Sequence, residues 1–186
     1  MKRLLAFVFL GLLLPMVTFA QGGLIGLYVD RWGGICDIAD SGIDIIDVYV
    51  IHKYTSGATA SQFRVVASVG FTGVYLGEEI PLQWGACIGN SQHGIALAYA
   101  HCHTSPIHIL TIRYLLNGTS APNSYLKVVG HPDPRIPDPK LAMVDCDSNT
   151  HPVLGGIAYI NNDGSADCAA TPVETQTWGR IKSLYR

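Results

Sequence analysis

The chain has 186 residues, with 12 Lys and Arg against 14 Asp and Glu, so its formal net charge is −2 with histidine neutral. A chain without a basic excess has no electrostatic field that would gather nucleic acid, so we expect no nucleic-acid partner. Charged residues make up only 14% of the chain, and Gly and Tyr are plentiful at 20 and 9 residues. This composition favours strands joined by tight turns and predicts an all-β protein.

The first twenty residues have the pattern of an export signal. Lys2 and Arg3 precede an uncharged apolar stretch from Leu4 to Leu14, and small residues before a cleavage point follow at Thr18 and Ala20. The apolar stretch is too short to cross a bilayer, which needs about 20 residues. We therefore expect cleavage near Ala20 and a mature chain without a transmembrane segment. The predicted location is secreted, periplasmic or at the cell surface.

Apolar residues alternate at period two along most of the remaining chain, and turn signals such as Asn117-Gly118 and Asp163-Gly164 separate the alternating runs. Two stacked sheets are the usual way for many short strands to bury their apolar faces. We predict a single β-sandwich, immunoglobulin-like or jelly-roll-like, over residues 21–172. The expected strands are Leu24 to Val29, Ile45 to Ile51, Gln62 to Ala67, Gly73 to Leu76, Ile95 to His101, Ile107 to Tyr114, Tyr125 to Val129, Leu141 to Asp145 and Gly156 to Ile160.

The segment from His131 to Pro139 departs from this alternation because it contains four prolines in nine residues. Proline cannot donate to a strand ladder and favours an extended backbone. We expect a stiff surface loop that connects two strands, with a binding loop as the alternative.

Residues 173–186 also depart from the alternation, and they predict a short amphipathic tail with the apolar spacing of a helix. Its apolar residues stand at i, i+3, i+6 and i+7, which is one helical face. Two interpretations stay open: the face packs on the sandwich, or an export or anchoring apparatus recognises it. The residues of this recognition hypothesis are Trp178, Ile181, Leu184 and Tyr185.

Five cysteines follow the signal, so they meet an oxidising compartment where disulfides persist. Cys146 and Cys168 bracket a turn signal, and we predict that they form a disulfide. The sequence does not choose a pair among Cys36, Cys87 and Cys102. The odd count leaves one thiol over, which we expect to be a small buried apolar side chain rather than a reactive one.

His101 and His103 are the strongest candidates for metal ligation. On an extended strand they point to one face, where two imidazoles suit Zn²⁺ or Cu²⁺, and Cys102 points away. The third ligand is left open between His52, His93 and an aspartate. The alternative is that both are strand-end histidines beside a disulfide.

Other constellations give weaker indications. Asp37, Asp40, Asp44 and Asp47 form an acidic cluster whose spacing does not match a twelve-residue Ca²⁺ loop. Residues 161–167 look more like half of such a loop, but Asp163-Gly164 between apolar runs first of all predicts a hairpin turn. The chain lacks the Gly-x-Ser-x-Gly pattern of a serine nucleophile. We therefore predict that the protein is not an enzyme and uses no cofactor.

Several stretches resemble uncharacterised secreted β-rich proteins of environmental bacteria, which combine an N-terminal signal with a TWGxIKxLY-type C-terminal tail. The resemblance implies a bacterial exported β-rich protein and carries no activity with it. The group has a cysteine near Val69 instead of Cys87, so it supports no disulfide pairing for this chain. The matching stretches are Gly23 to Tyr28, Gly57 to Phe63, Ile88 to Gln92, Ser105 to Ile112, Val144 to Cys146 and Thr177 to Tyr185.

These observations together predict a secreted, non-catalytic β-sandwich that serves as a binding, adhesion or surface-structural module. Its partner is an unknown protein or surface ligand. The first alternative is a metal-binding protein or metalloenzyme that uses His101 and His103. The second is an exported passenger whose C-terminal tail directs surface sorting or assembly.

Overall fold

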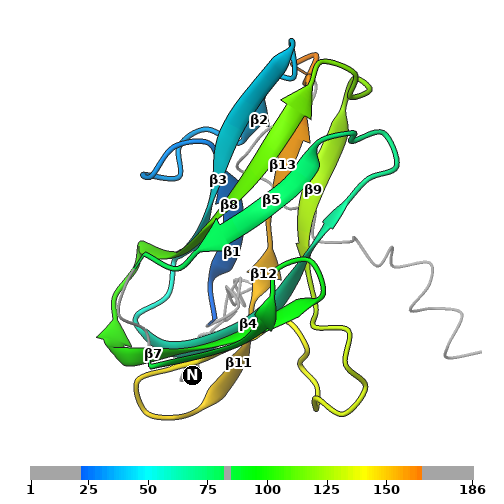
Figure 1. Cartoon of the computed structure of the whole chain (residues 1–186). Coiled ribbons are helices and arrows are strands. Elements are labelled where there is room, and N and C mark those ends of the chain that lie inside the picture. Colours follow the sequence, from blue (N-terminus) through cyan, green and yellow to red (C-terminus); the bar gives the residue numbers. More distant parts are fainter. Residues whose placement is uncertain (1–21, 82–84, 165–186) are drawn as a thin grey trace, which may run out of the picture.

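The computed structural model of the chain describes residues 22–81 and 85–164, which form β-strands without a helix (Figure 1). Within these ranges there is accordingly no helix that could span a membrane. The predicted signal peptide and C-terminal tail lie outside the described residues. The strands are β1 (Leu24–Tyr28), β2 (Asp37–Ile38), β3 (Ile43–Lys53), β4 (Ala58–Ala67), β5 (Val74–Glu79), β6 (Ala86–Asn90), β7 (Gly94–His103), β8 (Ile107–Asn117), β9 (Ser124–Val129), β10 (Ala142–Val144), β11 (Thr150–Pro152), β12 (Leu154–Gly155) and β13 (Ile157–Ile160).

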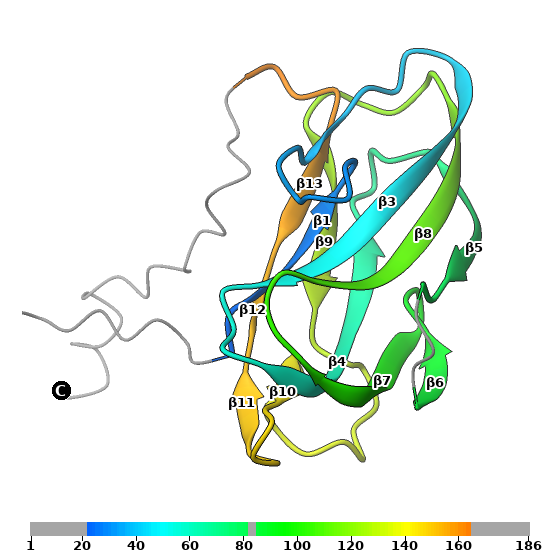
Figure 2. The ribbon, with the colours of Figure 1, turned by 90° about the vertical axis from the view of Figure 1, so that its left-hand side faces the viewer.

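The strands form two stacked sheets, which confirms the predicted all-β sandwich. The first sheet has the order β12-β1-β3-β8-β5, and the antiparallel ladder between β3 and β8 runs along almost the full length of both strands. Figure 2 shows β8 and β5 of this sheet on one side of the molecule and β9 and β13 of the second sheet on the other.

The second sheet is organised around β4. One edge of β4 pairs with β7, which in turn pairs with β6. The other edge of β4 pairs with two strands in succession. It pairs with β9, where Arg64 faces Val129, and then with β10, where Gln62 faces Ala142. Residues 130–141 therefore loop out between two strands that share one edge of β4. Beyond β9 the order continues through β13 to β2, and β11 lies outside β10.

The alternation of the sequence explains which faces are buried. In β4, Ser61, Phe63 and Val65 are buried, while the residues between them are more exposed. In β8 the alternation of buried and exposed residues is interrupted at Ile109 and Leu110, which are both buried. This interruption coincides with a register shift in the ladder opposite Val50 and Ile51. Complete burial of such a side chain contributes about 1.5–3 kcal/mol.

All nine predicted strands are present with boundaries within a few residues. Four further strands, β2, β6, β11 and β12, are not evident from the sequence pattern. Three of these have two or three residues, which is too short for a period-two pattern. The fourth, β6, is exposed or half-buried at every position and so gives no alternation of apolar and polar residues.

Asp40 of the acidic cluster has a structural role at one end of the sandwich. Its carboxylate is buried and accepts hydrogen bonds from the backbone N–H groups of Gly118 (2.6 Å) and Ser120 (3.0 Å). Asp47 instead pairs with Arg113 across β3 and β8. The described residues contain no group of three or more His, Cys, Asp or Glu that could hold a metal ion.

His52 fastens the start of the described chain to the core. Its ring is fully buried, and Nε2 donates a hydrogen bond to the carbonyl oxygen of Gly22, since a carbonyl can only accept. The other ring nitrogen, Nδ1, is buried without a hydrogen-bond partner. Burial lowers the pKa of His52, and the bond to Gly22 only partly opposes this effect. The neutral ring is therefore the form that the fold stabilises.

We expect the free energy of unfolding to decrease as the pH is lowered below about 6.5, the ordinary histidine pKa. Below this pH the histidine of the unfolded chain takes up a proton, whereas folded His52 stays neutral. The free energy of unfolding therefore decreases by at most about 1.4 kcal/mol per pH unit for this one proton. Denaturant titrations at several pH values should show the slope, and His52→Gln should reduce it. His101→Gln, at an exposed histidine, should keep it. An NMR titration in which His52 protonates at or above the ordinary value would contradict the prediction.

Candidate functional site

A groove of about 520 Å³ lies on the outer face of the second sheet. It lies at the end of the sandwich where β6, β7, β10 and β11 gather (Figure 2). We call it the alanine groove, because alanines from four strands line it. The lining residues are Ala60, Ser61, Gln62, Ala86, Ile88, Ala96, Leu97, Ala98, Pro137, Asp138, Pro139, Ala142, Met143, Val144 and Thr150.

The pleat of the strands produces the floor of the groove. In β7, Ile95 and Leu97 point into the core, so Ala96 and Ala98 face outward. Ala98 lies directly opposite Ala60 in β4 and Ala86 in β6. Three neighbouring strands thus carry a single methyl group at the same level of the sheet, and the small side chains leave a hollow.

Larger apolar residues form the walls. Ile88 stands on β6, the last strand on its side of the sheet, and its side chain is 74% exposed. Pro137 and Pro139 belong to the proline-rich segment, which is the surface loop between β9 and β10 that the sequence predicted. Gln62 in β4 donates a hydrogen bond from Nε2 to the carbonyl oxygen of Pro139 (3.1 Å) and so ties the loop to the sheet.

The chemistry of the alanine groove is that of a binding surface. Among the described residues that line it, Asp138 is the one charged side chain, and none is aromatic, histidine or cysteine. Sugars and bases are usually held by stacking on aromatic rings, and phosphates by cations. Aliphatic walls around a floor of small residues instead suit the apolar side chains of a polypeptide.

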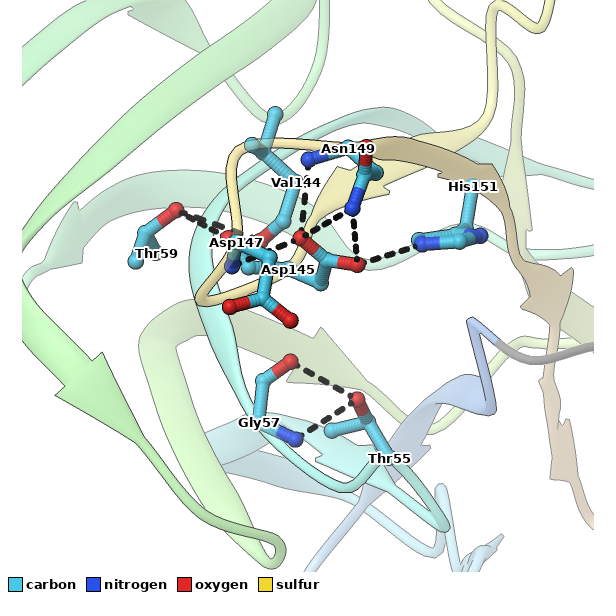
Figure 3. A network of polar contacts seen from close by, with 8 residues as sticks. All are labelled: Thr55, Gly57, Thr59, Val144, Asp145, Asp147, Asn149 and His151. Carbon is cyan, nitrogen blue, oxygen red and sulfur yellow. Dashed lines mark hydrogen bonds and ion pairs between the residues drawn. The ribbon is translucent and has the colours of Figure 1, made fainter.

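A compact polar network fixes the turn between β10 and β11 at the end of the groove (Figure 3). The Asp145 carboxylate accepts hydrogen bonds from the backbone N–H groups of Asn149 (2.8 Å) and Asp147 (2.9 Å) and from Nε2 of His151 (2.7 Å). These donors, first the backbone of Asn149, lower the pKa of Asp145 to about 2. The hydroxyl group of Thr59 donates to the Asp145 carbonyl oxygen (2.9 Å), which joins the turn to β4.

A disulfide between Cys102 and Cys146 lies beside this turn. The predicted bridge from Cys146 to Cys168 is therefore wrong, because Cys146 has a different partner. The ends of β7 and β10 converge on opposite edges of β4 near Gly57, whereas the prediction considered only the turn between Cys146 and Cys168. A Cβ atom added at Gly57 would lie 2.5 Å from Sγ of Cys146 and 3.0 Å from Sγ of Cys102, so this position needs glycine.

The identity and exposure of the free cysteine also bear on the prediction. Cys36 is disulfide-bonded, and Cys87 is the free cysteine of the described residues. The leftover thiol was expected to be buried, but Cys87 is exposed because β6 is the outermost strand of its sheet. Partial burial and the nearby Glu78 raise the pKa of Cys87 above its ordinary value.

The two predicted metal ligands lie at the end of β7, beyond the groove. His101 is exposed, whereas His103 is half-buried with its ring 6.0 Å from the ring of Tyr99. A register shift between β4 and β7 interrupts the regular ladder before this point, since Ala60 faces Ala98 but Ala58 faces His103. The prediction of a metal centre on this pair stays a prediction. The predicted recognition residues, Trp178, Ile181, Leu184 and Tyr185, lie outside the described residues.

Sequence reasoning did not find the alanine groove. Its floor residues sit at exposed positions of predicted strands, where a small apolar side chain gives no distinct signal. The available indication was the run Ala96, Ala98 and Ala100, in which alanine replaces the polar residue usually found on an outward face.

Removal of the Asp145 carboxylate should destabilise the turn and the adjoining wall of the groove. We expect Asp145→Ala to lower the thermal unfolding midpoint, because five hydrogen bonds from Asn149, Asp147 and His151 lose their acceptor. Asp147→Ala is the matched control in the same turn, since Asp147 contributes its backbone N–H there. Equal midpoints for the two variants would contradict the assigned role of Asp145.

Peptide mapping under non-reducing conditions should recover Cys102 joined to Cys146 and Cys87 open to alkylation. The count leaves Cys168, outside the described residues, as the expected partner of Cys36. The Cys102 bridge spans a sequence separation of 44 residues, and its loss in Cys102→Ser/Cys146→Ser should cost about 4 kcal/mol in the chain-entropy model. A peptide that joins Cys146 to any other cysteine would overturn the assignment.

Comparison with known proteins places the fold but not the function. No family model and no curated protein matches the sequence. A cohesin module from a family 33 glycoside hydrolase of Clostridium perfringens is similar in structure, with a TM-score of 0.50 and 7% identity over 76% of this chain and 99% of that chain.

Two further cohesins are similar in structure. One, in a type I cohesin–dockerin complex from Clostridium thermocellum, has a TM-score of 0.47 and 14% identity over 74% of this chain and 99% of that chain. The other is the sixth cohesin of scaffoldin B from Acetivibrio cellulolyticus, with a TM-score of 0.46 and 9% identity over 76% and 99%. The chain thus has a cohesin-like β-sandwich fold.

Proposed function

We propose that the protein is an exported, non-catalytic binding module that holds an apolar segment of a partner protein in the alanine groove. The observation that carries the proposal is the construction of the groove, with single methyl groups on its floor and Ile88 and two prolines on its walls. Such a surface lets a polypeptide approach the sheet closely and offers it aliphatic contacts.

The make-up of the lining favours a polypeptide over other ligands. A saccharide or a nucleotide would find no aromatic platform and no cation among the lining residues that the structure describes. The polar atoms of Gln62 and Thr150 can satisfy a few backbone groups of a bound chain, and Asp138 offers an acceptor to a cation. The groove is therefore suited to an apolar segment with polar or basic flanks.

The rest of the structure supports an exported module. Two cysteine pairs are consistent with an oxidising compartment, because Cys102 is bonded to Cys146 and Cys36 is also disulfide-bonded. A β-sandwich also provides a rigid scaffold for a preformed binding surface, which reduces the entropy cost of association. The metal-centre alternative at His101 and His103 gains no specific observation in its favour.

Two exposed isoleucines provide a matched test. Ile88 is on the groove wall, and Ile43, which is 86% exposed, begins β3 in the other sheet. We expect the mature protein to capture a partner from the exported fraction of its source cells, Ile43→Arg to capture it equally, and Ile88→Arg to lose it. Purified partner should then bind with an affinity that falls at least about tenfold in Ile88→Arg, which is 1.4 kcal/mol.

Circular dichroism and thermal unfolding of both variants provide the control for folding. A second groove variant, Ala98→Gln, fills the floor without adding charge and should also weaken binding. Capture that is the same for wild type, Ile88→Arg and Ala98→Gln would contradict the groove as the binding surface.

A further inference from the structure

The alanine groove presents an apolar surface to solvent although the chain continues beyond the described structure. Ile88 on its wall is 74% exposed, and the floor residue Ala98 is exposed as well. Exposed apolar surfaces of this kind usually have an occupant. Twenty-two residues follow Gly164, the last described residue, and they are the nearest source of a polypeptide for the groove.

The composition of the last twelve residues, Thr175–Arg186, matches the groove. Their four apolar residues are spaced as on one helical face, and none of the twelve is Asp or Glu. The apolar residues are Trp178, Ile181, Leu184 and Tyr185, and the basic residues are Arg180, Lys182 and Arg186.

The charges of the two parts are complementary. The described residues carry seven Lys and Arg against twelve Asp and Glu, a formal net charge of −5 with histidine neutral. The groove itself contains Asp138 and no cation, and Asp147 lies in the turn beyond its Val144 wall. A segment with three cations and no carboxylate side chain is therefore attracted to this end of the sandwich.

The connecting chain is long enough to reach the groove of the same molecule. Residues 169–177 follow the last cysteine and extend to about 30 Å. If that cysteine is held at Cys36, which accepts a hydrogen bond from Tyr159, the path begins on β2. Tyr125, the neighbour of Tyr159 across the ladder, bonds to Ser68, six residues from Gln62 in the groove. Six residues along β4 and three strand spacings across the sheet correspond to about 25 Å.

We propose, on the basis of the proposed function of the groove as a polypeptide-binding surface, that the segment Thr175–Arg186 docks its apolar residues in the alanine groove of its own chain. The segment then covers Ile88 and the alanine floor until a partner displaces it. Docking within one chain needs only modest intrinsic affinity, because the short connection gives a high effective concentration.

Photo-cross-linking in the full mature chain tests this docking. Benzoylphenylalanine in place of Trp178 keeps an aromatic side chain in the segment, and irradiation followed by peptide mass spectrometry locates its neighbours. We expect cross-links to β6, β7 and the loop of residues 130–141. They should be lost in Ile88→Arg and retained in Ile43→Arg.

Three outcomes would overturn the proposal. They are cross-links on the outer face of β3, β8 and β5, cross-links that Ile88→Arg does not change, and cross-links that join ¹⁴N and ¹⁵N chains in a mixed sample. The third outcome would show that the occupant comes from a second copy.

Limited trypsin digestion of the chain with Trp178 intact gives an independent measurement. Cleavage after Arg180 and Lys182 should be about tenfold faster in Ile88→Arg than in Ile43→Arg if docking leaves about a tenth of the segment accessible. Equal rates would contradict docking.

The two proposals fail in distinguishable ways. Loss of partner capture in Ile88→Arg, together with cross-links outside the groove, would contradict docking of the segment but support the groove as a binding site for a partner. Cross-links in the groove, without any partner whose capture depends on Ile88, would support docking of the segment but contradict the proposed function.

Discussion

The double use of β4 is the constraint on which the second sheet depends. One edge of this strand pairs with β7, and the other pairs first with β9 and then with β10, so residues 130–141 must leave the sheet between two segments of a single ladder. The loop that results contains the prolines that form one wall of the alanine groove, and Gln62 of β4 holds it by a hydrogen bond to Pro139. The groove is thus a consequence of how one strand distributes its hydrogen bonds.

The same end of the sandwich is reinforced by covalent and polar contacts. The Cys102–Cys146 disulfide joins the ends of β7 and β10 across Gly57, and Asp145 organises the turn that follows β10. Disulfides restrict the unfolded chain, and a carboxylate that accepts several N–H groups fixes a short turn. The floor and walls of the groove are therefore held in place before any partner arrives, which lowers the entropy cost of binding.

Sequence patterns predict the fold well because burial has period two in long strands such as β3, β4 and β8. They fail for β6, whose residues are accessible on both faces, and for the disulfide of Cys146, whose partner lies 44 residues away. The groove is also beyond sequence reasoning, because it requires Ala60, Ala86 and Ala98 to align across three strands, and that alignment depends on ladder registers. Local turn signals carry no information about such long-range alignment.

The position of Cys87 has a practical consequence. This thiol is exposed on β6 and directly precedes Ile88. A maleimide dye or spin label attached there would report on β6, the strand that carries Ile88, from the face of the sheet opposite to the groove, because Cys87 pairs with the inward-pointing Leu97. Burial and Glu78 raise the pKa of the thiol, so attachment should proceed faster in mildly alkaline buffer, where more of the nucleophilic thiolate is present. The natural sequence thus already contains a labelling site on the strand that forms one wall of the groove.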